Sequence, residues 1–314
     1  MEERRRQYAV RRAAVAVAAA VVAAVSVSCA AAAHDADPSA KIDVGDESGL
    51  VLPAAGSIWT SDLALGRVVR IDPTTNAVVA RIRVGTRPFG LAFGAGSVWV
   101  ADRSLPTLAR IDPRSTRVVK RIAIGLNSYG VTYAVGSVWV TSELDGTVRR
   151  INPRTNRVVA KIHAGTTPDG LAYAFGALWV ADLDGGRVLR IDPKRNRVTA
   201  RIAVERADWI TPSADGLRVS SETGVVARVD PVARRVVATV HVGANPLASA
   251  WVDGELWVPN LDAGTVSVVD PATNSVRVTL PAGRGPLAVA AVGDAAWLSN
   301  SGDGDIWRFP AARP

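Results

Sequence analysis

The feature that most constrains this chain is a repeat of 40 residues. Three consecutive units begin at Gly96, Gly136 and Gly176, and each runs from a segment such as GSVWV to an Arg-Ile-Asp/Asn-Pro turn and then to a valine-rich segment. Tryptophan keeps the same spacing at positions 59, 99, 139, 179, 257 and 297, and the missing member of this series falls on Val219. A fixed period of this length is typical of a repeat architecture, in which each unit is one supersecondary element.

Each unit is predicted to contain four short strands, which we label A to D. In the second unit they are residues 90–93, 97–100, 107–111 and 118–122, and strands B, C and D show β-branched or aromatic enrichment with stretches of alternation. The Asp-Pro turns join strand C to strand D, because proline presets the φ of the turn and aspartate bonds the backbone that follows. Four strands in about 40 residues are typical of a propeller blade. The sequence therefore predicts an all-β fold, a seven-bladed β-propeller of four-stranded antiparallel blades.

The two ends of the repeat region indicate how the ring closes. The last unit stops after a strand C at residues 306–309, and residues 41–45 (KIDVG) align with residues 81–85 (RIRVG) one period later. We therefore expect the N-terminal strand to pair with the last blade, since an unclosed ring would leave an open sheet edge. The propeller is predicted to span residues 40–314 as a single domain.

Residues 1–29 have the order of an export signal. An arginine-rich start is followed by an Ala/Val-rich run over residues 13–28, which is shorter than the roughly 20 apolar residues of a transmembrane helix, and then by small residues. Cys29 is a candidate for lipidation of the lipoprotein type, and the alternatives are cleavage near Ala33, a retained signal-anchor and a twin-arginine signal. Residues 30–39 are predicted to be a flexible tether. We expect an extracytoplasmic protein, secreted or anchored to the outer face of the cytoplasmic membrane.

Composition adds further limits. The chain has one cysteine, so it can form no internal disulfide. Its formal charge is +8, and five of its arginines lie before residue 13, which leaves a mildly basic remainder that permits anionic partners without requiring them. No Ser-His-Asp triad, phosphate loop, dinucleotide fingerprint, calcium loop or zinc spacing can be assembled from the sequence.

The pattern W-V-A-[DN] followed by V-x-R-I-D-P-x-T-N-x-V-V-A-x-I-x-V-G resembles the YVTN-repeat propellers, including the YncE-like secreted proteins, over residues 41–309. This resemblance implies an extracytoplasmic binding platform, and single-stranded nucleic acid binding is attributed to a YncE-like member. The chain also resembles virginiamycin B lyase (streptogramin lyase), a family that uses histidines, a glutamate and Mg²⁺ at one channel mouth. Here His163 and His241 occupy the same outer slot of strand D in different blades, and neither Glu222 nor Glu255 has a histidine partner that can be placed beside it.

The loops between strands D and A, and between strands B and C, gather at one mouth of a propeller channel. We compare equivalent positions there, because a concave apolar surface with a few polar groups is the usual binding site. The start of strand A carries Gly49, Phe89, Tyr129, Asp169, Trp209, Leu247 and Leu287. Two residues earlier lie Glu47, Arg87, Asn127, Thr167, Ala207, Asn245 and Gly285. The predicted ligand-binding residues are Arg87, Phe89, Asn127, Tyr129, Asp169, Trp209 and Asn245, and the alternative is that these side chains plug the channel or cap the blades.

A second ring of polar residues follows strand B. Its members are Asp62, Asp102, Ser142, Asp182, Glu222, Asn260 and Asn300. The four acidic residues Asp62, Asp102, Asp182 and Glu222 form a predicted acidic ring that would favour a cation. The alternative is that they bond their own hairpin backbone.

The turns between strands C and D form the opposite face. Blades 2 to 5 place nine basic residues there, which we call the basic rim: Arg114, Arg117, Arg154, Arg157, Lys194, Arg195, Arg197, Arg234 and Arg235. The rim predicts contact with anionic lipid headgroups or another polyanion, each surface cation contributing about 1 kcal/mol, and the alternative is a solvated charged face. No aromatic residue is interleaved with the cluster, which disfavours specific nucleic-acid binding.

These features favour a non-enzymatic, YncE-like scaffold that binds a small ligand or a protein of unknown identity, and a monomer. The alternative is a propeller enzyme of the streptogramin lyase type, and polyanion binding by the basic rim is a second alternative. We expect no metal and no cofactor, except Mg²⁺ or Ca²⁺ under the enzyme alternative.

Overall fold

The computed structural model describes residues 37–310. The predicted export signal, Cys29 and most of the predicted tether lie outside the described residues. Within residues 37–310, no helix combines the length and the apolar character that crossing a bilayer requires.

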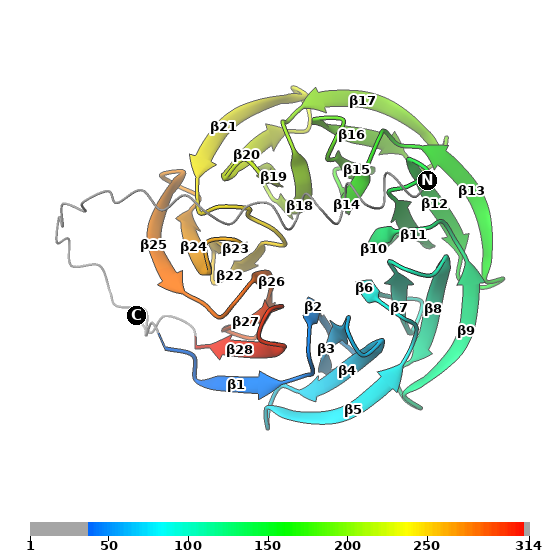
Figure 1. Cartoon of the computed structure of the whole chain (residues 1–314). Helices are drawn as coiled ribbons and strands as arrows, with labels where there is room; N and C mark the ends of the chain where they lie inside the picture. Colours follow the sequence, from blue (N-terminus) through cyan, green and yellow to red (C-terminus); the bar gives the residue numbers. More distant parts are fainter. Residues whose placement is uncertain (1–36, 311–314) are drawn as a thin grey trace. The chain divides into compact units, whose positions relative to one another are not determined.

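The described chain forms 28 strands in seven antiparallel sheets of four, arranged as blades around a central axis (Figure 1). Blade 1 comprises β2 (Ser48–Ala54), β3 (Ser57–Asp62), β4 (Arg67–Asp72) and β5 (Ala77–Arg83). Blade 2 comprises β6 (Pro88–Gly94), β7 (Ser97–Asp102), β8 (Thr107–Asp112) and β9 (Arg117–Ala123). Blade 3 comprises β10 (Ser128–Ala134), β11 (Ser137–Ser142), β12 (Thr147–Asn152) and β13 (Arg157–His163). Blade 4 comprises β14 (Pro168–Ala174), β15 (Ala177–Asp182), β16 (Arg187–Asp192) and β17 (Arg197–Ala203).

Blade 5 comprises β18 (Ala207–Ser213), β19 (Gly216–Ser221), β20 (Val225–Asp230) and β21 (Arg235–His241). Blade 6 comprises β22 (Ala250–Val252), β23 (Glu255–Asn260), β24 (Thr265–Asp270) and β25 (Ser275–Pro281). Blade 7 comprises β26 (Pro286–Val292), β27 (Ala295–Asn300), β28 (Asp305–Phe309) and β1 (Ala40–Asp43). The strands of position A lie nearest the axis and those of position D form the outer edge, so the predicted all-β, seven-bladed propeller is confirmed.

The predicted closure by the N-terminal strand is also confirmed. Strand β1 pairs with β28 in antiparallel register, from Ala40 opposite Arg308 to Asp43 opposite Asp305. Beyond the strand, the amide of Val44 donates to the carbonyl of Gly304 at 3.0 Å. The side chains of Ile42 and Val44 are buried, and they join a core cluster that contains Trp297. Blade 7 is therefore built from both ends of the described chain.

The repeated Ser, Trp, Arg and Pro residues join blades 1 to 4 to one another. In blade 2 the Arg110 guanidinium lies 5.0 Å from the centre of the Trp99 ring, and its Nε donates to Ser97 at 2.8 Å. Its Nη1 donates to the carbonyl of Pro153 in the next blade at 2.8 Å. The same contact to the next blade recurs for Arg70 and Arg150. The arginine of the Arg-Ile-Asp-Pro motif thus stacks on the tryptophan of its own blade and donates to the proline carbonyl of the next blade. These two contacts recur around part of the ring.

Blade 5 differs from the sequence alignment by one residue. Arg218 pairs with Arg228 just as Trp99 pairs with Arg110, so Arg218 occupies the tryptophan position and the prediction of Val219 is wrong. The D–A loop before blade 5 is one residue shorter, because only Glu205 separates Val204 from Arg206, where Gly85 and Thr86 separate Val84 from Arg87. The buried Arg218 donates to Ser213 and lies over the Trp251 ring, so that Trp251 from blade 6 supplies an indole next to this position.

Asp215 forms an ion pair with Arg218, the residue at the tryptophan position of blade 5. This ion pair predicts that the stability of the protein depends on pH. Ser213 donates to the Asp215 carboxylate at 2.6 Å, and Arg218 and Arg228 lie 3.1 and 2.9 Å from it. The Ser213 hydrogen bond is the largest cause that lowers the pKa of Asp215, to about 2 from 3.8. A lowered folded-state pKa contributes stability above the unfolded pKa and loses it as the pH falls through the folded pKa. We expect the stability difference between the wild-type protein and Asp215→Asn to be present above pH 3.8 and to close as the pH falls towards about 2, measured by urea unfolding at several pH values. A difference that is constant with pH would contradict this assignment.

Candidate functional site

Seven backbone hydrogen bonds define the positions at the mouth of the channel. In each blade the residue after strand B donates its amide to a carbonyl of the preceding D–A loop, for example Leu63 to Glu47 at 2.8 Å and Glu222 to Arg206 at 3.1 Å. The accepting residues, which we call the mouth positions, are Glu47, Arg87, Asn127, Thr167, Arg206, Asn245 and Gly285. Because the bond is made by the backbone, it fixes where a side chain starts without fixing which side chain it is.

The shift in blade 5 changes three of the predicted equivalences. Arg206, not Ala207, is the mouth residue, and Asp208, not Trp209, matches Phe89 and Tyr129 at the start of strand A. In the ring that follows strand B, the position of Asp102 is taken by Ser221, and Glu222 lies one residue further along. Arg206 and Asp208 were not predicted from the sequence because the predicted equivalences keep an interval of 40 residues from blade 4 to blade 5. The 39-residue interval between Trp179 and Arg218 is the signal that would have revealed them.

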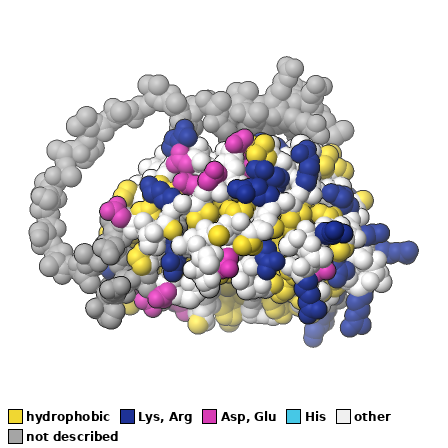
Figure 2. Space-filling view, turned by 90° about the horizontal axis from the view of Figure 1, so that it is seen from below, with side chains coloured by type: hydrophobic (Ala, Val, Ile, Leu, Met, Phe, Trp, Pro, Cys, Tyr) yellow, Lys and Arg dark blue, Asp and Glu magenta, His cyan; other side chains and the backbone are white. Residues whose placement is uncertain are grey.

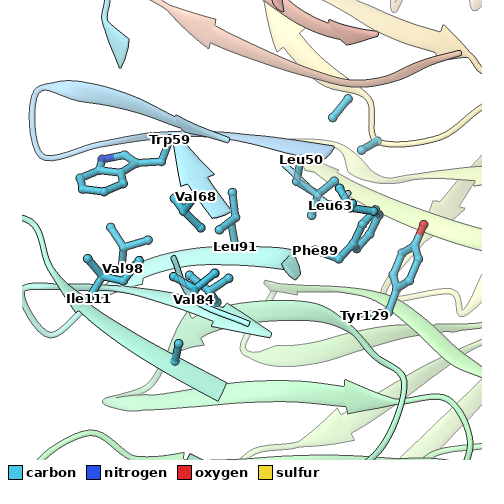
Figure 3. Close-up of a cluster of buried hydrophobic side chains, with 14 of the residues drawn as sticks. Leu50, Trp59, Leu63, Val68, Val84, Phe89, Leu91, Val98, Ile111 and Tyr129 are labelled. Carbon is cyan, nitrogen blue, oxygen red and sulfur yellow. The ribbon is translucent and has the colours of Figure 1, made fainter. Parts of the chain in front are cut away.

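The predicted aromatic residues meet at the axis as a plug. The Phe89 and Tyr129 rings lie 4.4 Å apart between centroids, and Tyr129 meets Trp209 edge-on at 6.4 Å. Phe89 and Tyr129 are buried in a cluster with Leu50, Leu247 and other residues, part of which Figure 3 shows, and Trp209 is partly buried against the same cluster. Of the two roles considered for these residues, the described structure displays the plug, with Trp209 as its most exposed aromatic ring.

Arg103 and Glu143 connect the plug to the mouth positions of blades 2 and 3. The Arg103 guanidinium lies 5.2 Å from the Phe89 ring and 5.0 Å from the Tyr129 ring, which are cation–π distances. Its Nη2 lies 3.7 Å from the Glu143 carboxylate. Asn127 donates to Glu143 at 2.5 Å and accepts from Arg103 at 3.4 Å. Arg87, which is exposed, pairs instead with Glu47 of blade 1 at 2.7 Å.

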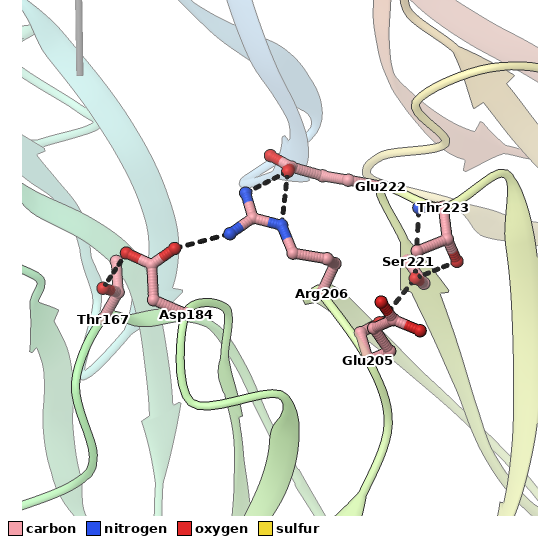
Figure 4. Close-up of polar contacts among 7 residues, drawn as sticks. All are labelled: Thr167, Asp184, Glu205, Arg206, Ser221, Glu222 and Thr223. Atoms are coloured by element: carbon pink, nitrogen blue, oxygen red, sulfur yellow. Dashed lines mark hydrogen bonds and ion pairs between the residues drawn. The ribbon is translucent and has the colours of Figure 1, made fainter. Parts of the chain in front are cut away.

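Arg206 forms the corresponding junction between blades 4 and 5 (Figure 4). Its Nη1 donates to Asp184 at 2.5 Å, its Nε donates to Glu222 at 2.9 Å, and its Nη2 also pairs with Glu222. Asp184 in turn accepts from the hydroxyl of Thr167 at 2.8 Å. Burial, the largest single cause, lowers the pKa of Arg206, but Glu222 and Asp184 outweigh it and raise the pKa above its usual value.

The buried aspartates of the predicted acidic ring hold backbone amides. Asp102 accepts from the amides of Thr86 and Arg87 through one oxygen and from those of Ser104 and Leu105 through the other, at 2.7 to 3.0 Å. Asp182 binds Thr166, Thr167 and Arg187 in a similar way, and Asp62 binds Leu65 and Arg67. Of the two roles considered for this ring, the structure displays the bonding to the backbone of the hairpins and of the D–A loops. Asp102 and Asp182 thereby position the mouth residues Arg87 and Thr167.

The glycine of the repeated Ile-x-Val-Gly segment leaves room for this contact. A Cβ on Gly85 would lie 2.0 Å from the Asp102 carboxylate, and one on Gly165 would lie 2.1 Å from that of Asp182. Such distances are impossible without movement, so glycine is required where the D–A loop passes over the buried aspartate.

The remaining predicted residues lie apart from these two networks. Asn245 is a partly buried mouth residue in blade 6, and the nine residues of the basic rim are exposed on the opposite face. His163 and His241 are exposed at the ends of β13 and β21. Within residues 37–310, no three His, Cys, Asp or Glu side chains come together as a metal site would require.

Two comparisons found no relative, and the third shows the fold. No family model and no curated protein matches this sequence. Among solved structures, the WD40 β-propeller domain of Doa1 superposes with a TM-score of 0.75 and 13% identity, covering 87% of this chain and 96% of that one. Hydrazine synthase from Kuenenia stuttgartiensis gives a TM-score of 0.74 and 13% identity, with 86% and 96% covered. At this identity the likeness establishes a seven-bladed propeller scaffold and no activity.

Proposed function

We propose that this chain is an extracytoplasmic, YncE-like binding scaffold whose channel mouth takes a ligand that carries positive charge. The observation that supports this proposal is the imbalance of charge over the aromatic plug. Six carboxylates gather at or next to the mouth positions, from Glu47, Glu143, Asp169, Asp184, Asp208 and Glu222. Three guanidiniums accompany them, from Arg87, Arg103 and Arg206, and the ion pair of Arg284 with Asp303 beside Gly285 adds no net charge.

The chemistry of such a mouth suits an amine or guanidinium group on an apolar body. Carboxylates recognise these cations through charge-assisted hydrogen bonds, and the partly exposed ring of Trp209 offers a face for a cation or an apolar group. A lysine- or arginine-bearing peptide segment, free or part of a protein, has this chemistry.

The test uses two substitutions with opposite expected effects. A short peptide of alternating lysine and phenylalanine is titrated into residues 37–314 by calorimetry, and its glutamate counterpart serves as the reverse-charge probe. Glu222→Gln removes a negative charge and should weaken binding of the lysine peptide, whereas Arg206→Ala exposes Asp184 and Glu222 and should strengthen it. Each change is expected to be about fivefold, since a unit charge at about 4 Å in water contributes roughly 1 kcal/mol.

Arg228→Ala is the matched control. Arg228 pairs with Asp215 at 2.9 Å, and its side chain is 34% exposed, close to the 35% of Arg206, but it lies in blade 5 towards the opposite face. Affinity should be unchanged in this variant. Preferential binding of the glutamate peptide, or equal affinities in both mouth variants, would refute a cationic ligand at this site.

A further inference from the structure

The face opposite the mouth carries its charge on one side only. The nine residues of the basic rim are all exposed, and they lie in the C–D turns and at the starts of β9, β13, β17 and β21, in blades 2 to 5. Within the described residues, Arg195 alone of the nine forms an ion pair, with Asp192 at 2.8 Å. The edge-on view of Figure 2 shows Lys and Arg side chains projecting from one end of the lower edge, on the side where β9 and β13 lie in Figure 1.

Exposed apolar residues lie on this same face and in the same blades. Strands A and C run in the same direction within an antiparallel blade, so the A–B hairpins end beside the C–D turns. Phe93 and Tyr173 lie near the ends of their strands A, Val135 and Phe175 are hairpin tips, and Val232 follows β20. All five are between 39% and 86% exposed. The basic turns themselves contain no aromatic residue, and the aromatic residues on this face come from strand A and the A–B hairpins of the blades.

The other three blades lack this combination. Their hairpins carry Ala55, Asp253 and Asp294, and the C–D turns of blades 1 and 6 carry Thr74 and Thr273. The face therefore has a basic and apolar sector, formed by blades 2 to 5, and a polar or acidic sector, formed by blades 6, 7 and 1.

Two of the hairpin tips are apolar in spite of their backbone conformation. Val135 has a φ of 50° and Phe175 a φ of 51°, a left-handed conformation that Gly, Asn and Asp adopt at least cost. A branched or bulky residue is strained in this conformation, and the equivalent residues in blades 1, 2 and 6 are Ala55, Ala95 and Asp253. The hairpin itself does not require an exposed valine or phenylalanine at its tip.

We propose that the sector formed by blades 2 to 5 docks on an anionic bilayer surface. Lysine and arginine near such a surface are attracted to anionic headgroups. Aromatic residues favour the interfacial region, and exposed aliphatic side chains are stabilised when they leave water for the bilayer. A nucleic acid would use the same cations and stack bases on the aromatic rings, but it offers nothing to Val135 and Val232. This docking surface is independent of the mouth, which faces away from it.

The experiment measures binding of residues 37–314 to sedimented vesicles of phosphatidylcholine with and without phosphatidylglycerol. This segment contains every strand of the ring, including the closing strand β1, so it folds as the propeller does. We expect binding to the anionic vesicles alone, and weaker binding as salt is added. Replacing both Arg154 and Arg157 by Gln should weaken binding roughly twentyfold or more, from about 1 kcal/mol per cation. Replacing both Val135 and Phe175 by Ser should weaken binding at high salt as well.

Matched controls remove the same chemistry elsewhere. Arg81→Gln with Arg83→Gln removes two exposed cations from the outer strand of blade 1, and Val119→Ser alters a valine that is 54% exposed on the outer strand of blade 2. Neither control should change vesicle binding. Equal binding to neutral vesicles, equal losses in the controls, or binding of a single-stranded oligonucleotide but not of anionic vesicles at the same salt would each overturn the proposal.

Discussion

Deletion of residues 40–46 is expected to abolish the cooperative thermal unfolding of the propeller. The deletion removes the pairing of β1 with β28, and the buried side chains of Ile42 and Val44 leave the cluster around Trp297. Burial of two such side chains contributes about 1.5–3 kcal/mol each, and each lost backbone hydrogen bond adds roughly 0.5–1.5 kcal/mol. The total is comparable with the whole net stability of a typical domain, about 5–15 kcal/mol. Circular dichroism and calorimetry should show a broad transition at much lower temperature.

A point substitution separates the closing contact from the length of the chain. Val44→Asp places a charge at a position that is 0% exposed, and it should lower the melting temperature strongly while leaving every residue in place. Val79→Asp is the control, because Val79 lies on the outer strand of blade 1 and is 53% exposed. If the deletion variant melts cooperatively at the wild-type temperature, β1 does not hold the ring closed.

The second large effect is expected for Asp102→Ala, at roughly 3–5 kcal/mol of unfolding free energy, because four backbone amides lose a charged acceptor. Asp102 is 3% exposed, and those amides belong to the loops on both sides of the mouth, at Thr86, Arg87, Ser104 and Leu105. For a domain of this size the loss corresponds to a fall in melting temperature of about 10 °C. Asp102→Asn keeps the shape but turns an amide group towards two of the donors, so its effect should be intermediate.

Asp112→Ala is the internal comparison for this prediction. Asp112 also follows a strand of blade 2, and it accepts from the amide of Arg114 and the hydroxyl of Ser115, but on an exposed turn. Since water can replace the aspartate there, the variant should melt close to the wild-type protein. Similar losses in the two variants would mean that burial of Asp102 adds nothing to its contacts.

The ring was predictable because its determinants are local and repeated. The tryptophan of strand B, the arginine of strand C and the Asp-Pro turn each recur at the same offset, and the structure shows them in contact within a blade and with the next blade. The closing strand was predictable for the same reason, since KIDVG aligns one period before RIRVG.

The candidate site was less predictable, because it depends on single-residue differences between blades. One residue fewer in the D–A loop before blade 5, between Val204 and Arg206, moves Arg206, Asp208 and Arg218 into positions that a constant period gives to their neighbours. The apolar sector opposite the mouth was missed for another reason. Phe93, Tyr173 and Phe175 are separated from the basic turns in sequence by a strand B and a strand C, and only the antiparallel order of the blade brings them to one face.

The seven amide-to-carbonyl bonds at the mouth have a consequence for how recognition in this chain can change. They hold seven residues at corresponding points around the axis through their backbone carbonyls, and the bonds themselves do not depend on the side chains. Exchanging Arg206 and Asn245, which share a left-handed φ of 49° and 54°, would rearrange the charges around the axis without requiring a new backbone conformation. A change of ligand specificity in such a protein can therefore come from exchanging side chains between mouth positions, without a new loop.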